Sequence, residues 1–276
     1  MPKIRKGLIT IAIGKKYAIQ AKYLAYSCML HTPHTIRAVI TDRPALLTGY
    51  FDILIPYNPE YGDPFAAKTM LHRYTPFEKT LYLDADSLVM TGIDSYWEAL
   101  ETRSFAYTGE LVKEGEWYFD IKKVMAKLSL PWIPKFNSGM LLFDSSEKSK
   151  VIFDTANDYM ENHGELEVSF FREKMLPDEP YLAIALAKQG EKPYTDYGRF
   201  SRTLIGADHI HLDSIKGFAS FIKRGVQVFP QVVHFCGRFG QFLYLSEKIK
   251  LYFCFNPPLK TFFNCIFTII RNMMNR

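Results

Sequence analysis

The segment Lys79-Thr-Leu-Tyr-Leu-Asp84-Ala-Asp86 sets two carboxylates, at positions i and i+2, directly after a short apolar run. The run at 80–83 is typical of a buried strand, and side chains two residues apart point to the same side of an extended chain. Carboxylate oxygens are ligands that Mg²⁺ and Mn²⁺ prefer, and such a cation can hold a diphosphate. The segment therefore predicts a metal site where a buried strand ends, and the alternative is an ordinary solvated turn.

Strands and helices alternate before this segment. The apolar run at 7–13 predicts a buried parallel strand that ends at Gly14, and apolar residues from Ala18 to Met29 then recur at steps of three and four, as in a helix. Further strands are expected at 36–40 and 53–55, and a further helix at 65–74. This order predicts an α/β fold with a Rossmann-like, mainly parallel sheet flanked by helices, which binds ligands beyond the carboxyl ends of its strands.

The second half of the chain is less regular. Strands are expected at 105–108 and 140–143, and helices from a cap at Ser145 to Tyr159 and from Asp178 to Lys188. The long, charged segment 110–135 between them predicts an insertion over the ligand-binding face. We expect one catalytic domain at 1–245, with a nucleotide-binding half at about 1–108 and an acceptor half at about 109–245, and an appendage at 246–276.

Composition excludes several classes of protein. The 276 residues are 48% hydrophobic and 15% aromatic, enough for a large core, and this excludes a disordered chain. The net charge is +5 without a basic run longer than a pair, which disfavours nucleic acid as a partner. The four cysteines show no CxxC spacing and the chain has no Asn-x-Ser/Thr sequon, so we expect a reduced, cytoplasmic setting.

The last twenty residues carry an amphipathic pattern. Apolar residues from Phe262 to Met274 recur at helical steps, and no acidic residue follows Glu247. The cations Lys260, Arg271 and Arg276 favour an anionic lipid surface. Segment 257–276 therefore predicts peripheral membrane contact, and the alternative is packing on the catalytic domain or on a second copy in a homodimer.

Four motifs together resemble glycosyltransferase family 8, the group of glycogenin and the bacterial lipopolysaccharide glucosyl- and galactosyltransferases. They are Leu81-Tyr-Leu-Asp-Ala-Asp86, Phe136-Asn-Ser-Gly-Met-Leu-Leu-Phe143, Leu176-Pro-Asp-Glu179 and Val232-Val-His-Phe-Cys-Gly-Arg238, in the order usual for the family. The resemblance spans residues 8 to about 241. It implies the GT-A fold and the transfer of a hexose from a UDP-sugar to a glycan, glycolipid or protein acceptor, with retention of anomeric configuration.

The resemblance also implies a set of site residues. Asp84, Asp86 and His234 would hold Mn²⁺ (or Mg²⁺) between the UDP phosphates. Asn137, Asp178 and Glu179 would lie beside the reacting sugar. The remaining donor-binding residues implied are Thr10, Ile11 and Ala12 of the first strand, Tyr17 stacked on uracil, Lys68 facing the phosphates and sugar, and Ala85, Ser138, Gly237 and Arg238.

Two departures from the family pattern affect the donor site. The family usually has Asp-Gln where this chain has Asp178-Glu179, and its Lys-Pro-Trp is here Phe239-Gly-Gln241. Diphosphate binding then needs another cation, and the candidates are Arg238, Lys223 and Arg224.

The acceptor site has a candidate in the insertion. The side chains of Trp117, Tyr118 and Trp132 lie within 110–135, and aromatic faces suit sugar rings. The alternative is that these three side chains pack the insertion onto the core.

Other functions fit the sequence less well. In a phosphatase of the haloacid dehalogenase type Asp84 would be the nucleophile, but that motif lies near the N-terminus and has Thr or Val where this chain has Leu88. A nucleotidyltransferase needs a glycine-rich phosphate loop, and Gly14-Lys-Lys16 is too short to form one. A non-catalytic, sugar-nucleotide-binding relic of the fold would explain the lost Lys-Pro-Trp, but not the retention of two aspartates together with His234.

Overall fold

The computed structural model describes residues 3–170, 175–236 and 240–256. Its centre is a six-stranded sheet in the order β3-β2-β1-β4-β9-β6. The strands are β1 (Ile4–Ala12), β2 (Arg37–Thr41), β3 (Ile53–Pro56), β4 (Phe77–Leu83), β6 (Phe105–Ala106) and β9 (Met140–Asp144). The first four strands of the sheet are parallel, while β9 is antiparallel to β4 and β6 is antiparallel to β9. The predicted α/β fold with a mainly parallel sheet is confirmed.

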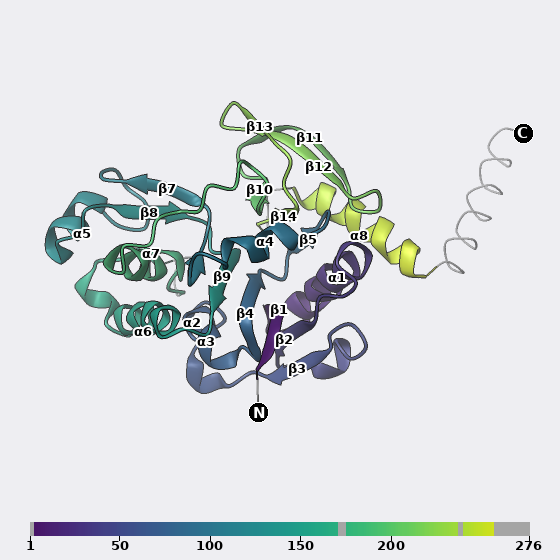
Figure 1. Cartoon of the computed structure of the whole chain (residues 1–276), viewed down its shortest axis with the longest axis horizontal. Helices are drawn as coiled ribbons and strands as arrows, with labels where there is room; N and C mark the ends of the chain where they lie inside the picture. The colour runs from purple at the N-terminus through teal and green to yellow at the C-terminus, as the bar shows by residue number, and fades with distance from the viewer. Residues whose placement is uncertain (1–2, 171–174, 237–239, 257–276) are drawn as a thin grey trace, which may run out of the picture.

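Helices cover both faces of the sheet (Figure 1). On one side, Leu8 and Leu81 pack with Leu24 of α1 (Lys15–His31) and with α4 (Asp94–Ala99). On the other side, Ile9 and Tyr82 pack with α6 (Glu147–Glu161) and α7 (Glu179–Lys188). Neighbouring residues of each strand thus enter opposite cores, which explains why these strands are continuous apolar runs.

Some expected elements differ at their ends. The helix expected at 65–74 is two short helices, α2 (Ala66–Thr69) and α3 (Leu71–Tyr74), because Met70 leaves helical geometry with ψ near 7°. The strand expected at 105–108 covers only Phe105–Ala106. The N-cap of α6 is Ser146 and not Ser145, since the Ser146 hydroxyl accepts the amide hydrogen bond of Ser149 at 3.3 Å.

The insertion folds onto the core. It contains β7 (Gly109–Val112), α5 (Ile121–Leu128) and β8 (Ile133–Phe136), with β7 and β8 paired antiparallel. Trp132 is only 9% exposed and belongs to the core shared with α6 and α7. The packing alternative therefore holds for Trp132.

Two small sheets complete the ligand-binding side of the chain. One has the order β10-β14-β5 and the other β11-β12-β13. The strands are β5 (Ser87–Val89), β10 (Arg202–Thr203), β11 (Ala207–Asp213), β12 (Phe218–Lys223), β13 (Val226–Val228) and β14 (Val232–His234). Because β5 follows Asp86 directly and pairs with β14, the register sets His234 opposite Ser87. This pairing brings His234 to the two aspartates, although about 150 residues of chain separate them.

The last described helix, α8 (Gln241–Phe255), packs against α1, and the rings of Phe255 and Tyr26 stack with centroids 4.3 Å apart. This helix spans the boundary expected at 245/246. No helix among the described residues is long and apolar enough to cross a membrane. The expected amphipathic segment 257–276 lies outside the described residues.

Candidate active site

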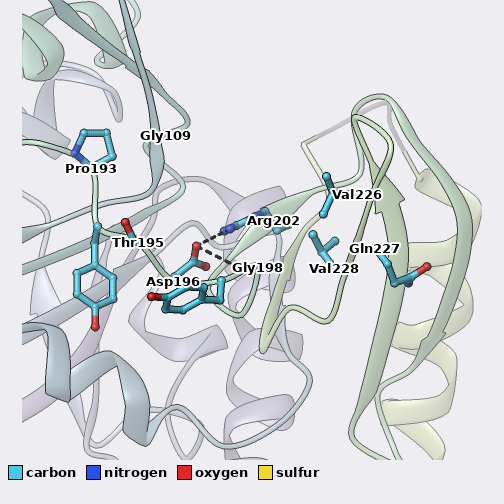
Figure 2. Close-up of a pocket in the computed structure, with 11 residues that line it drawn as sticks. Gly109, Pro193, Thr195, Asp196, Gly198, Arg202, Val226, Gln227 and Val228 are labelled. Carbon is cyan, nitrogen blue, oxygen red and sulfur yellow. Dashed lines mark hydrogen bonds and ion pairs between the residues drawn. The ribbon is translucent and has the colours of Figure 1, made fainter.

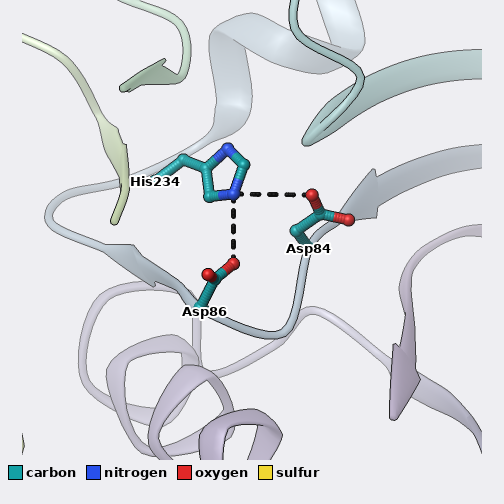
Figure 3. A group of neighbouring side chains, drawn as sticks. All are labelled: Asp84, Asp86 and His234. Atoms are coloured by element: carbon teal, nitrogen blue, oxygen red, sulfur yellow. Dashed lines mark ion pairs between the residues drawn. The ribbon is translucent and has the colours of Figure 1, made fainter. Parts of the chain in front are cut away.

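Asp84, Asp86 and His234 converge beyond the carboxyl end of β4 (Figure 3). The Nε2 atom of His234 lies 3.0 Å from Oδ1 of Asp86 and 3.4 Å from Oδ2 of Asp84. One ligand atom from each residue lies within 4.8 Å of the others. Burial alone would lower the pKa of His234, but the carboxylate of Asp86 raises it well above its ordinary value. The three side chains thus form a compact site for a positive charge.

Neighbouring side chains orient these three candidate metal ligands. The Oδ1 atom of Asn137 lies 2.7 Å from Nδ1 of His234, and because a carbonyl oxygen only accepts, Nδ1 is the donor and Nε2 faces the aspartates. The buried hydroxyl of Tyr82 donates to Oδ1 of Asp84 at 2.5 Å, which leaves Oδ2 toward His234. Partners of this kind fix the ligands of metal centres. Two carboxylates and an imidazole held in this way fit a divalent cation.

A buried lysine joins the metal candidates to the expected sugar site. Lys68 is 4% exposed, and its Nζ lies 3.2 Å from Asp84, 3.3 Å from Asp178 and 3.0 Å from the hydroxyl of Ser138. Burial alone would lower the pKa of Lys68, but the carboxylates of Asp178 and Asp84 raise it above its ordinary value. The lysine is therefore a fixed positive charge between two carboxylates.

Asp178 is the N-cap residue of α7, which confirms the predicted start of this helix. In the described part of the chain, however, its carboxylate makes no capping hydrogen bond and pairs with Lys68 instead. Burial raises the pKa of Asp178, while the charge of Lys68 opposes this shift. The carboxylate of Asp178 is therefore part of the candidate site and does not stabilise the start of α7 by capping.

Glu179 lies at the centre of a second set of hydrogen bonds. Its Oε1 accepts from Nδ2 of Asn137 at 2.8 Å and from the amide of Ser138 at 3.2 Å, and its Oε2 accepts from the hydroxyl of Tyr118 at 3.2 Å. Burial and the charge of Asp178 raise the pKa of Glu179 to about 7. Of the three aromatic residues proposed for the acceptor site, Tyr118 is the one that reaches this set.

Gly139 leaves room for the imidazole. A Cβ atom at this position would lie 2.2 Å from Nδ1 of His234 and 2.8 Å from Oδ1 of Asn137. No side chain fits there, so the glycine of the Asn-Ser-Gly segment is required by the close approach of β14 and not by its own φ angle.

The predicted nucleotide residues lie at the same edge of the sheet. Thr10, Ile11 and Ala12 are buried at the end of β1, and Tyr17 is 37% exposed in the first turn of α1. Asp42, which was not predicted from the sequence, follows β2 and accepts the amide hydrogen bond of Gly14 at 2.7 Å. The rule that ligands bind where parallel strands end could have indicated Asp42.

Among the described residues, Lys223 is the candidate for the second cation of the donor site that lies near His234. Lys223 donates to Thr203 Oγ1 at 2.8 Å and to the carbonyl of Ile205 at 2.7 Å, and Thr203 lies opposite His234 in the β10–β14 pair. Arg224 is turned away and pairs with exposed Glu110 at 2.7 Å. Gly237 and Arg238 lie outside the described residues.

Comparison of the chain with protein-family models and with curated proteins gives no match. Solved structures do match. The galactosyltransferase LgtC, in complex with donor and acceptor sugar analogues, aligns with a TM-score of 0.59 and 19% identity, over 88% of this chain and 95% of that one. A glutamine-to-glutamate active-site mutant of LgtC aligns with a TM-score of 0.60 and 20% identity, over 89% of this chain and 95% of that one.

The bifunctional glycosyltransferase WbbM aligns with a TM-score of 0.55 and 8% identity, over 91% of this chain and 52% of that one. At these identities the likeness concerns the fold. The predicted GT-A glycosyltransferase fold, and the family resemblance at the level of the fold, are confirmed.

Proposed function

We propose that this chain is a metal-dependent glycosyltransferase, which moves a hexose from a UDP-sugar to a glycan, glycolipid or protein acceptor with retention of anomeric configuration. The observation that carries the proposal is the convergence of Asp84, Asp86 and His234 beside the buried ammonium of Lys68, at the ligand-binding edge of the sheet. The fold shared with LgtC and WbbM supports it.

The charges of the site suit the departure of a diphosphate. Cleavage of a sugar–diphosphate bond builds negative charge on UDP and positive charge at the anomeric carbon. A divalent cation held by Asp84, Asp86 and His234, Mn²⁺ or Mg²⁺, would act as a Lewis acid toward the phosphates when bound. Lys68 Nζ supplies a second, permanent positive charge, 3.2 Å from Asp84 Oδ1.

The other flank of the site suits the sugar. Asp178 lies 3.3 Å from Lys68, and Glu179 is held by Asn137 and Ser138, so two carboxyl groups and a carboxamide line one region. Negative or partly negative oxygens there favour positive charge at the anomeric carbon. We assign Asp178 and Glu179 proximity to the sugar and no nucleophilic role.

The contacts of Asp84 disfavour the phosphatase alternative. A nucleophilic aspartate needs an oxygen open to the substrate, but Oδ1 of Asp84 is engaged by Tyr82 and Lys68, and Oδ2 faces His234. These contacts suit a metal ligand better than a nucleophile.

Incubation of the protein with UDP-glucose, UDP-galactose and their N-acetyl forms tests the function. UDP release from at least one donor should require Mn²⁺ or Mg²⁺ and stop with a chelator. Release that persists with a chelator, or none from any donor with either metal, would contradict the proposal.

Peripheral membrane contact through 257–276 belongs to the proposal as well. A protein that lacks these residues should lose flotation with anionic vesicles. If the full chain does not float, a tail packed on the domain or on a second copy is the better account.

A further inference from the structure

A groove of about 570 Å³ opens among β7, β10 and β13 (Figure 2). We call it the β13 groove. Its walls are Gly109 of β7, the loop 193–198, Arg202 of β10 and residues 226–228 of β13. None of these residues belongs to the metal or sugar set described above.

Strand pairing connects the groove to β14, the strand that carries His234. Arg202 and Thr203 of β10 lie opposite Val233 and His234 of β14, and neighbouring strands are about 4.8 Å apart. The backbone of the groove residue Arg202 therefore lies one strand away from β14, the strand that carries His234.

A second wall leads to the sugar site. Gly109 lies opposite Phe136, the residue before Asn137, and Nη1 of Arg202 reaches the hydroxyl of Thr108 at 3.5 Å. The strand pair β7–β8 thus joins the groove to the residues that hold Glu179.

The loop that lines the groove is held firmly. The carboxylate of Asp196 accepts from Nη2 of Arg202 at 2.6 Å and from the amide of Phe200 at 2.5 Å, and the ion pair is visible in Figure 2. The side chain of Asp196 is 6% exposed and that of Arg202 is 19% exposed. Their charges cancel, so the groove offers fixed polar groups without net charge from this pair.

Within this firm loop, one aromatic side chain faces solvent. Tyr197 is 88% exposed, and its backbone is in the left-handed region with φ 52°, between the hydrogen-bonded Asp196 and Gly198. A large, rigid ring with a polar tip suits a surface that is apolar on one face and carries hydroxyls on its edge. A sugar ring has this character.

We propose that the β13 groove binds neutral sugar residues of the acceptor, with Tyr197 stacked on a ring and the Asp196–Arg202 pair lining its edge. The inference deepens the proposed function, on which it rests. It moves the aromatic contact with the acceptor from Trp132, which is buried, to Tyr197.

Saturation-transfer NMR without donor tests the groove directly, with maltose, lactose and N,N′-diacetylchitobiose as probes. At least one disaccharide should receive saturation from the native protein. Tyr197→Ala should weaken its binding about threefold to tenfold, because an aromatic contact contributes roughly 0.5–1.5 kcal/mol. Tyr197→Phe should keep most of the affinity. Phe218→Ala is the matched control, since Phe218 is a 46% exposed ring at the other end of β12.

Each outcome decides the proposal. If no disaccharide receives saturation, or if Phe218→Ala weakens binding as much as Tyr197→Ala does, the groove is not a sugar site. Hydrolysis of the donor by water tests the proposed function independently of the groove, so it distinguishes a groove that does not bind sugar from a chain that is not a glycosyltransferase. Tyr197→Ala should leave metal-dependent hydrolysis unchanged and raise only the KM for the sugar acceptor. Sugar binding in a protein that hydrolyses no donor would contradict the proposed function while it supports the groove.

Discussion

Replacement of Glu179 by glutamine should change how the stability of the protein depends on pH. Glutamine keeps the carbonyl oxygen that accepts from Asn137 and Ser138, and its amide group can donate to the oxygen of Tyr118. The substitution therefore removes the ionisable group and conserves the size and the contacts of the side chain.

The sign and magnitude follow from the raised pKa of Glu179. The folded protein holds this proton up to pH about 7, whereas an unperturbed glutamate releases it near 4.5. Because the folded state binds the proton more tightly, the free energy of unfolding falls as pH rises through this window. The shift corresponds to about 3 kcal/mol, and solvent near this partly buried side chain reduces it to about 2 kcal/mol. Above pH 7 Glu179 is ionised in the folded protein, and the free energy of unfolding is lowered by this full amount. Glu179→Gln removes this destabilisation, because glutamine does not ionise.

Urea unfolding at pH 5 and pH 8, without donor or metal, measures the effect. When the pH rises from 5 to 8, the free energy of unfolding of Glu179→Gln should increase by about 2 kcal/mol relative to that of the native protein. The exposed helix residue Glu98 provides the control, since Glu98→Gln should follow the native protein. If the difference between Glu179→Gln and the native protein is the same at both pH values, Glu179 does not hold a proton at neutral pH and the reasoning fails.

Two further substitutions test the residues that position the candidate metal ligands. Tyr82→Phe removes the hydroxyl that orients Asp84 and should weaken Mn²⁺ binding roughly 10- to 100-fold in calorimetry, whereas Tyr96→Phe, at a buried tyrosine of α4, should not. Gly139→Ala forces a methyl group against His234 and should lower the free energy of unfolding by about 1–3 kcal/mol in urea. Gly92→Ala meets open space and serves as its control; equal losses in both glycine variants would contradict the packing argument.

The sequence predicted the central strands because they are buried on both faces. Apolar runs such as 7–13 and 80–83 carry this signal without help from tertiary structure. The start of α6 was harder, because Ser145 and Ser146 are the same residue type and only the hydrogen bond from the Ser149 amide to the Ser146 hydroxyl distinguishes them. Asp178 is the N-cap residue of α7 as predicted, but its carboxylate pairs with Lys68 instead of capping the helix.

The candidate site residues that lie within the family motifs were predicted from the sequence, whereas several of their hydrogen-bond partners were not. Tyr82 could have been found, because it precedes Asp84 by two residues and so shares its side of the strand. The contact of Tyr118 with Glu179 joins segments 61 residues apart and leaves no local signal. For Trp132 the sequence left two interpretations open, and its burial selects core packing.

The central claim is that Asp84, Asp86 and His234 hold a cation that is required for binding of the diphosphate. Calorimetric titration of the protein with UDP tests this claim most directly. The account predicts UDP binding with Mn²⁺ or Mg²⁺, little or none with a chelator, and a collapse of metal-dependent binding in Asp86→Ala. Asp158→Ala, at an exposed position of α6, should bind as the native protein does. Equal affinity for UDP with metal and with chelator, or an Asp86→Ala protein that binds like Asp158→Ala, would contradict the account.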